Sequence, residues 1–157
     1  MGTHDYEVAV IGGGSAGYAT ARTTAAAGRR TVVIDGGGEL GGLCILRGCM
    51  PTKALLHAAE VRHQARRSSI WGLDPGEVGF DFGAVMQRKA AMVEEFASYR
   101  RGQLQDGRFE LIRALARFRD PHTLELDNSQ TITAGQIMIA TGSRVAALPM
   151  PGLTKLG

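Results

Sequence analysis

The chain has 157 residues, which is enough for one domain with its own hydrophobic core. Hydrophobic residues make up 44% and charged residues 21%, the composition of a water-soluble globular protein. The net charge of +3 is small and the arginines are spread over several segments, which argues against nucleic-acid binding. The sequence shows no signal peptide and no apolar run of membrane-spanning length, so we expect a cytoplasmic protein without a membrane anchor.

A strand, a helix and a second strand are predicted at the start of the chain. Residues 6–11 form an apolar run typical of a buried parallel strand, and Gly-x-Gly-x-x-Gly follows at residues 12–17. A helical run at residues 18–27 leads to a second apolar strand at residues 31–34, and Asp35 stands at the end of that strand. This order predicts a βαβ unit.

The glycine spacing of this unit fits a dinucleotide-binding loop. Gly12 permits a tight turn, Gly14 lets a pyrophosphate approach the backbone, and Gly17 lets the helix pack closely against the strand. The helix N-terminus favours phosphate oxygens, and an acid at the end of the second strand can accept hydrogen bonds from ribose hydroxyls. A glycine-rich loop alone can be only a turn, but the strand, helix and acid together favour nucleotide binding. The predicted nucleotide-binding residues of this unit are Gly12, Gly14, Ser15, Ala16, Gly17, Asp35 and Gly36.

Both cysteines, Cys44 and Cys49, lie close together in the next segment. A helix is predicted from Pro51 to residue 67, directly behind the second thiol. The helix N-terminus and the positive charge of Lys53 both favour a thiolate. A zinc site would need a second cysteine pair, whereas two buried structural thiols are an alternative that the residues leave open. A stable structural disulfide is not expected in the cytosol, so a disulfide here would be catalytic.

The stretch Gly-Gly-Leu-Cys-Ile-Leu-Arg-Gly-Cys-Met-Pro-Thr-Lys at residues 41–53 resembles a known redox-disulfide signature, Gly-Gly-Thr-Cys-x-Asn-x-Gly-Cys-x-Pro-Ser/Thr-Lys. That signature belongs to the class I pyridine nucleotide-disulfide oxidoreductases, such as dihydrolipoamide dehydrogenase, mercuric reductase and glutathione reductase. Leu43 and Leu46 depart from it, at positions where the family usually has Thr and Asn. The Pro-Thr-Lys ending is nearer to the lipoamide and mercury enzymes than to the glutathione type.

A loop and a long helix are predicted next. Residues 68–79 contain several Gly and Pro residues, and Trp71 within them is predicted to be a packing anchor. Asp81 is predicted to cap a long helix that ends near residue 104. The helical spacing of apolar residues predicts its buried face, which consists of Phe82, Val85, Met86, Met92, Val93, Phe96 and Tyr99.

After residue 108 the apolar period changes to that of strands. Residues 114–133 predict a small antiparallel β-meander with two turns. Residues 137–140 predict another buried strand, which ends in a turn at residues 141–143. The family has an Ala-Thr-Gly-Ser turn at this place, beside the flavin.

The whole pattern predicts an α/β fold, a Rossmann-like FAD-binding domain with a central parallel sheet and a small antiparallel β-meander. This domain would span residues 1–143. Residues 144–157 would be a linker toward a nicotinamide-binding domain that is absent from the sequence. Because the resemblance covers only the N-terminal part of a family member, we expect the isolated chain to be inactive.

The resemblance implies a reaction and its cofactors. NAD(P)H would reduce FAD, which would pass two electrons to a Cys44–Cys49 disulfide. Cys49 would be the thiol nearer the flavin, Cys44 the interchange thiol that meets the substrate, and Lys53 would lie near the flavin ring. The substrate would be a small-molecule disulfide or a metal ion, and the full-length protein would be a homodimer. No resident metal site is predicted.

The resemblance also implies further contacts to FAD in the cysteine stretch, the meander and the strand-end turn. These residues are Gly42, Leu43, Cys44, Gly48, Cys49, Lys53, Ala116, Ala140, Thr141, Gly142 and Ser143. The alternative function is a truncated, non-catalytic module that binds FAD or another nucleotide. NAD in place of FAD is disfavoured, because the cysteine pair would then have no redox partner.

Overall fold

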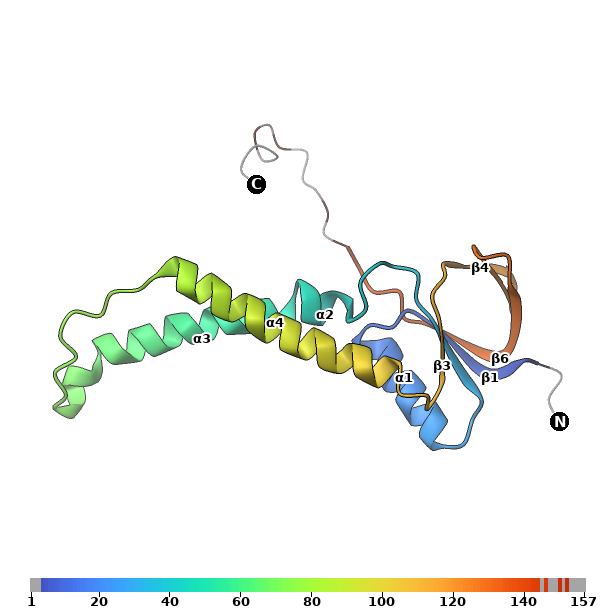
Figure 1. The fold of residues 1–157 in the computed structure, drawn as a ribbon, viewed down its shortest axis with the longest axis horizontal. Helices are drawn as coiled ribbons and strands as arrows, with labels where there is room; N and C mark the ends of the chain where they lie inside the picture. Colours follow the sequence, from blue (N-terminus) through green and yellow to red (C-terminus); the bar gives the residue numbers. More distant parts are fainter. Residues whose placement is uncertain (1–3, 145, 147–149, 151, 153–157) are drawn as a thin grey trace.

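The computed structural model describes residues 4–144, 146, 150 and 152, and it shows one mixed sheet with helices beside it (Figure 1). The sheet has the strand order β3-β2-β1-β6-β5-β4. Its β3, β2, β1 and β6 pair in parallel, and its β6, β5 and β4 pair antiparallel, which confirms the predicted fold. Most of the predicted linker lies outside the described residues. The strands are β1 (Tyr6–Ile11), β2 (Thr31–Ile34), β3 (Glu110–Ile112), β4 (Ala116–Asp120), β5 (Thr123–Leu126) and β6 (Thr131–Ile139).

Strand β1 lies between β2 and β6, and this position explains its continuous apolar sequence. It pairs with β2 from Val8 opposite Thr31 to Ile11 opposite Ile34. The last four residues of β1 and all of β2 are buried. A parallel strand that is covered on both faces requires an apolar residue at every position rather than at alternate ones. The predicted strands of the βαβ unit are therefore confirmed.

One long strand, β6, joins the parallel and antiparallel parts of the sheet. Thr131 lies opposite Glu125 of β5, while the later residues pair with β1 as far as Ile139. The prediction of a separate strand at residues 137–140 is wrong, because the last strand of the meander continues into it without a turn. The predicted burial fails there too, since Met138 and Ile139 are 46% and 64% exposed.

The helices differ from the prediction mainly around the cysteines. The short helix α2 was not predicted, and α3 begins at Cys49 rather than at Pro51. The cap of α4 is confirmed, because Asp81 Oδ1 accepts a hydrogen bond of 3.2 Å from Ala84 N. The helical segments are α1 (Ser15–Ala26), α2 (Gly42–Leu46), α3 (Cys49–Arg66), the short 3-10 helix η1 (Ser68–Trp71) and α4 (Phe82–Leu104).

The hydrophobic core lies on both faces of the parallel strands. One cluster contains Ile34 and Leu124, so it joins these strands to the meander. The other contains Val10, Tyr18 and Leu104, so it joins the sheet to α1 and to the end of α4. Helices α3 and α4 form a hairpin that extends away from this core (Figure 1). Among the described residues, no helix is both long enough and apolar enough to span a bilayer.

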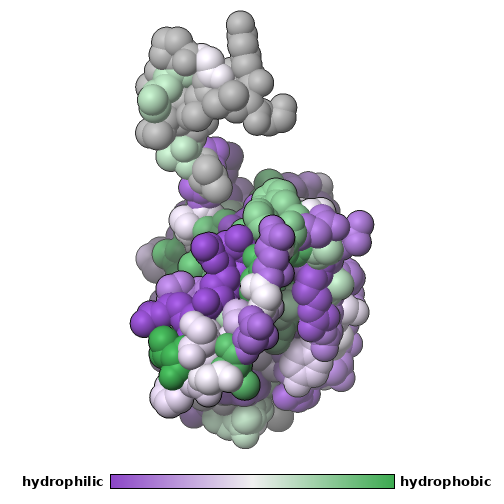
Figure 2. Space-filling model, turned by 90° about the vertical axis from the view of Figure 1, so that its left-hand side faces the viewer, coloured by the Kyte–Doolittle hydropathy of each residue, from purple (hydrophilic) through white to green (hydrophobic). Residues whose placement is uncertain are grey.

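The far end of this hairpin carries exposed apolar side chains. Trp71 is 80% exposed, so the prediction of a packing anchor is wrong. Ile70 and Phe80 are exposed as well. Figure 2 looks onto this side of the molecule and shows hydrophobic side chains between hydrophilic ones. A large aromatic residue in a loop packs only where another element reaches it, and the hairpin extends beyond the sheet.

The predicted buried face of α4 is only partly correct. Helix α4 packs mainly against α3 and less against α2, and these neighbours do not cover the whole of a broad apolar face. Four of the predicted residues are half-buried, namely Val85, Met86, Met92 and Val93. The other three are exposed, namely Phe82, Phe96 and Tyr99.

Helix α4 is attached to α1 by a cation–aromatic contact. The ring of Tyr18 in α1 is 6% exposed, and the guanidinium carbon of Arg100 in α4 lies 4.0 Å from the ring centroid. A guanidinium over a buried aromatic face is attracted by the ring quadrupole. Tyr18 therefore holds the base of the hairpin against the helix that follows the glycine motif.

Removing the Tyr18 ring should destabilise the fold. Tyr18→Ala should lower the free energy of unfolding by about 3 kcal/mol, the usual effect of deleting a buried aromatic ring. Tyr18→Phe keeps the ring and should lose only about 1 kcal/mol. Tyr99→Ala, at an exposed position of α4, is the control and should change stability by under about 0.5 kcal/mol. Urea denaturation followed by circular dichroism measures all three, and equal losses at the two tyrosines would contradict the assigned contact.

Candidate functional site

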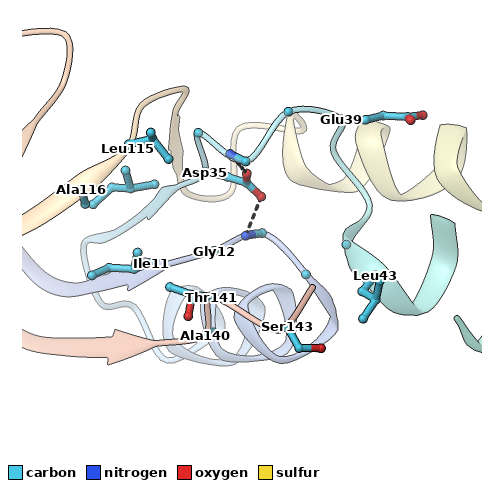
Figure 3. Close-up of a pocket in the computed structure, with 18 of the residues that line it drawn as sticks. Ile11, Gly12, Asp35, Glu39, Leu43, Leu115, Ala116, Ala140, Thr141 and Ser143 are labelled. Carbon is cyan, nitrogen blue, oxygen red and sulfur yellow. Dashed lines mark hydrogen bonds between the residues drawn. The ribbon is translucent and has the colours of Figure 1, made fainter. Parts of the chain in front are cut away.

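A cleft of about 410 Å³ opens at the carboxyl ends of the parallel strands. Ile11 and Ile34, the last residues of β1 and β2, form part of its wall. Figure 3 shows Leu115 and Ala116 on one side of the cleft and Thr141 and Ser143 on the other. In open parallel sheets this edge is where ligands bind, because loops from several strands converge there.

The cleft brings together most of the predicted nucleotide-binding residues. Three members of the first glycine motif do not line it, namely Ser15, Ala16 and Gly17. Four members of the cysteine stretch do not line it either, namely Cys44, Gly48, Cys49 and Lys53. The predicted residues that do line it are Gly12, Gly14, Asp35, Gly36, Gly42, Leu43, Ala116, Ala140, Thr141, Gly142 and Ser143.

Two glycines of the first motif are required by the backbone itself. Gly12 has φ +107°, and a Cβ atom there would lie 2.3 Å from the carbonyl oxygen of Ala140. A Cβ atom at Gly17 would lie 1.8 Å from the carbonyl oxygen of Gly12. Any side chain at either position would collide with backbone atoms. These contacts set α1 directly beneath the turn that leaves β1.

Gly14 differs from both, because the protein itself leaves room for a side chain there. Its φ of −68° is open to any residue, and the nearest atom to an added Cβ is the Cα of Gly42, at 3.7 Å. Gly14 is also the N-cap of α1 and offers no side-chain hydrogen bond to the first turn. The first amides of α1 can therefore bind anionic oxygens. The space beside Gly14, at the N-terminus of α1, therefore fits a pyrophosphate.

Asp35 connects the two loops that border the cleft. Its Oδ2 accepts a hydrogen bond of 2.8 Å from Gly13 N, and its Oδ1 accepts one of 3.1 Å from Gly37 N (Figure 3). The side chain of Arg113 forms an ion pair of 3.8 Å with the same Oδ1. Each carboxylate oxygen has a second acceptor site, so a ribose hydroxyl can still bind. The predicted ribose acceptor thus also organises the protein around it.

Some lining residues were missed by the sequence prediction. Gly13, Gly37, Arg47 and Leu115 line the cleft, and none of them was predicted to do so. Gly13 was missed because it stands at a variable position of the glycine motif. Leu115 was missed because it precedes the predicted contact residue Ala116 in a strand-like alternation, which would place the two side chains on opposite faces. The run of three glycines at residues 36–38, directly behind the predicted ribose acid, was a usable signal for a loop at the ligand.

The cysteine pair lies on two successive helices beside this cleft. Cys44 is on α2, whose neighbouring Leu43 lines the cleft, and Cys49 is the first residue of α3. Both are free thiols, with Cys44 half-buried and Cys49 exposed. Among the described residues, no group of three or more His, Cys, Asp and Glu side chains could hold a metal ion.

The expected preference of Cys49 for the thiolate is wrong for the reduced pair. A hydrogen bond with the Cys44 thiol raises the pKa of Cys49 above its usual value. Lys53 lowers that pKa, as predicted, but its effect is smaller. Loss of the Cys49 proton breaks the hydrogen bond that this proton makes to the Cys44 sulfur, and negative charge on Cys44 repels a second thiolate, so both effects favour the protonated form of Cys49.

The fold and the cleft define a class of protein, a nucleotide-binding α/β domain of the Rossmann type with a thiol pair beside its site. A family model described as pyridine nucleotide-disulphide oxidoreductase matches residues 6–157. The chain belongs to this family, which confirms the resemblance seen in its cysteine stretch. Members of the family use FAD and NAD(P)H, the cofactors that the sequence predicted.

Individual proteins of known type are also similar to this chain. Dihydrolipoyl dehydrogenase of Geobacillus stearothermophilus is 35% identical over 146 residues, which are 91% of this chain and 31% of that protein. Mercuric reductase of Bacillus cereus is 33% identical over 156 residues, 99% of this chain and 24% of that protein. The structure of the HOCl-induced flavoprotein disulfide reductase RclA from Escherichia coli matches with a TM-score of 0.71 at 31% identity. That match covers 95% of this chain and 31% of RclA. The chain thus spans less than a third of the length of these relatives.

Two substitutions should move the pKa of Cys49 in opposite directions. Cys44→Ala removes the main cause of the raised pKa and should shift the onset of Cys49 alkylation to lower pH. Lys53→Ala removes the cation that opposes it and should shift the onset to higher pH. Iodoacetamide labelling of Cys49 as a function of pH, followed by mass spectrometry under reducing conditions, measures both shifts. Shifts of the same sign would show that the local charges have been misassigned.

Proposed function

We propose that this chain is the FAD-binding and redox-dithiol segment of a flavoprotein disulfide reductase. The observation that carries the proposal is the space at Gly14. This space lies at the uncapped start of α1 and beside Gly42 of the helix that carries Cys44. A nucleotide held there by its pyrophosphate would have the thiol pair as its neighbour. No other part of the described chain combines a phosphate cradle, a ribose acceptor and two thiols.

The residues of the cleft would hold FAD in a defined direction. The amides of Ser15, Ala16 and Gly17 in the first turn of α1 would meet the pyrophosphate. Asp35 would accept from the adenosine ribose, and the backbone near Ala116 would meet the adenine. The turn at residues 140–143 and the start of α3 would meet the flavin end. FAD, when bound, supplies the two-electron redox chemistry that the reaction requires.

The cysteines would carry out the exchange with a disulfide substrate. The Cys44 thiolate attacks one substrate sulfur, so a mixed disulfide forms and one substrate thiolate leaves. The Cys49 thiolate then attacks the Cys44 sulfur, which releases the second substrate thiolate and leaves a Cys44–Cys49 disulfide. The substrate gains two electrons and the pair loses two, while the two thiol protons go to the released thiolates. The raised pKa of Cys49 favours its protonated form before this second attack.

The substrate is proposed to be a small-molecule disulfide or a metal ion that a dithiol can bind. The relatives support this range, since they include a dihydrolipoyl dehydrogenase and a mercuric reductase. We further propose that the complete reaction uses NAD(P)H in a longer, homodimeric protein in the cytoplasm. Among the residues that the structure describes, Leu115 at the cleft and Ile139 next to it are exposed, so a further segment of a longer protein could cover them.

Gly14→Val should weaken FAD binding and leave the fold intact. The valine fits the protein but occupies the space assigned to the pyrophosphate, so affinity should fall by about tenfold to a hundredfold. Quenching of flavin fluorescence measures affinity, and a thermal melt checks the fold. Gly79→Val, at a loop position with no atom within 4 Å of an added Cβ, is the control and should bind FAD normally. Unchanged affinity in Gly14→Val would sink the assignment of the cleft.

Mild oxidation should convert the two thiols into one intramolecular disulfide. Cys44→Ser and Cys49→Ser should each leave a single thiol that forms no such bridge. Mass spectrometry after alkylation counts the free thiols, and two free thiols in a folded, oxidised sample would count against the proposal.

The alternative function is a module that binds FAD without catalysis. A turnover assay distinguishes it from the proposed function. A steady-state assay would use NADH or NADPH with added FAD, and lipoamide, glutathione disulfide or Hg(II) as acceptor. We expect FAD binding but negligible turnover by residues 1–157, and turnover in a longer chain. Turnover by residues 1–157 that disappears in Cys44→Ser would instead make this segment an enzyme by itself.

A further inference from the structure

Arg113 makes contacts around the cleft that its sequence position does not reveal. It follows β3 directly, and β3 is the edge strand that pairs with β2. Its Nη2 donates a hydrogen bond to the carbonyl oxygen of Gly38, and its Nη1 lies 3.8 Å from Asp35 Oδ1. Arg113 itself does not line the cleft. The guanidinium of Arg113 therefore connects Asp35, the predicted ribose acceptor, to the glycine loop that follows it, from a position outside the cleft.

The loop that Arg113 contacts is flexible in sequence and is held by a small number of contacts. Residues 36–38 are three consecutive glycines, whose backbone loses more conformational entropy on ordering than any other residue. Gly36 packs against the backbone of Ala114, where a Cβ would lie 2.4 Å from the carbonyl carbon. Gly37 N donates to Asp35, and Gly38 receives its bond from Arg113. At the far end, Glu39 forms an ion pair of 3.6 Å with Arg101 of α4.

We infer that Arg113 is a positioning residue for the adenosine half of the nucleotide, which it serves by fixing Asp35 and residues 36–38 in their binding geometry. The inference rests on the proposed function. Without the guanidinium, the Gly38 carbonyl loses its charge-assisted donor and Asp35 Oδ1 loses the cation beside it. The loop then has to be ordered by the ligand, and that ordering weakens binding.

The two contacts require an arginine. Its planar fork offers separate N–H groups that reach two acceptors on different segments, whereas the lysine ammonium is a single point charge. Arg119 provides a matched control. It forms an ion pair with Glu125 at the same separation, 3.8 Å, but on the meander and outside the cleft. A general effect of losing one exposed arginine should therefore be equal at both positions.

The test compares Arg113→Ala, Arg113→Lys and Arg119→Ala in titrations of the purified chain with FAD, ADP and FMN. ADP carries the adenosine half and FMN lacks it. Arg113→Ala should weaken binding of FAD and of ADP on the order of tenfold, the size expected for one charge-assisted hydrogen bond. Arg113→Lys should restore only part of the loss. FMN binding should be the same in all variants, and Arg119→Ala should bind all three ligands as the unmodified chain does.

Hydrogen exchange adds a readout without ligand, since the amide of Gly37 should exchange faster in Arg113→Ala than in Arg119→Ala. Normal FAD affinity in Arg113→Ala overturns the inference and leaves the proposed function standing. An equal loss for FMN, or a fall in melting temperature beyond that of Arg119→Ala, also overturns it, because the role would then be general stability. If the unmodified chain binds neither FAD nor ADP, the proposed function fails and this inference fails with it.

Discussion

The fold depends on one backbone approach, in which α1 lies directly against the turn that leaves β1. Gly17 sits on the carbonyl of Gly12, and Gly12 in turn lies beneath the carbonyl of Ala140. Three segments meet here with no space for a Cβ atom. This contact places the N-terminus of α1, with Gly14 as its N-cap, at the cleft on the carboxyl edge of the sheet. A larger residue at Gly12 or Gly17 would separate these segments, whereas at Gly14 it would only fill the cleft.

At the same edge of the sheet, the carboxylate of Asp35 connects two loops by hydrogen bonds. Asp35 receives the amide of Gly13 from the first glycine motif and the amide of Gly37 from the loop behind it. Two loops that are far too glycine-rich to hold a shape by side-chain packing are thereby tied to one residue at the end of β2. Asp35 also borders the cleft, so the carboxylate that would bind the ribose also holds the two loops beside it. A change at this residue would therefore alter the loops as well as the ligand contact.

The sequence predicted the parts of the molecule whose constraints are local. A continuous apolar run indicates a strand covered on both faces, and glycines at fixed spacing indicate a backbone approach, so β1, α1 and β2 were predicted correctly as elements of the fold. The side chain of Asp81 as a cap is equally local. The exposure of Trp71 and of Tyr99 was not predictable in this way, because periodicity shows which face of an element is apolar but not which other element reaches it. Strand β6 was divided in two for a related reason. Its first half has the alternation of a strand with one exposed face, its second half the apolar run of a buried strand, and both belong to one strand with different neighbours.

The thiol pair shows why a motif and its geometry carry different information. The spacing of Cys44 and Cys49 indicated the chemistry, and the helix N-terminus with Lys53 suggested an easily formed thiolate at Cys49. In the folded pair Cys49 favours its protonated form instead, because the hydrogen bond with Cys44 outweighs the effect of Lys53 on the pKa of Cys49. In a dithiol that must react in sequence, this is a workable arrangement. In the proposed exchange, the thiol that would attack second is Cys49, the thiol whose pKa is raised. In the proposed function, the same two sulfurs would carry out the exchange, and their hydrogen bond raises the pKa of Cys49.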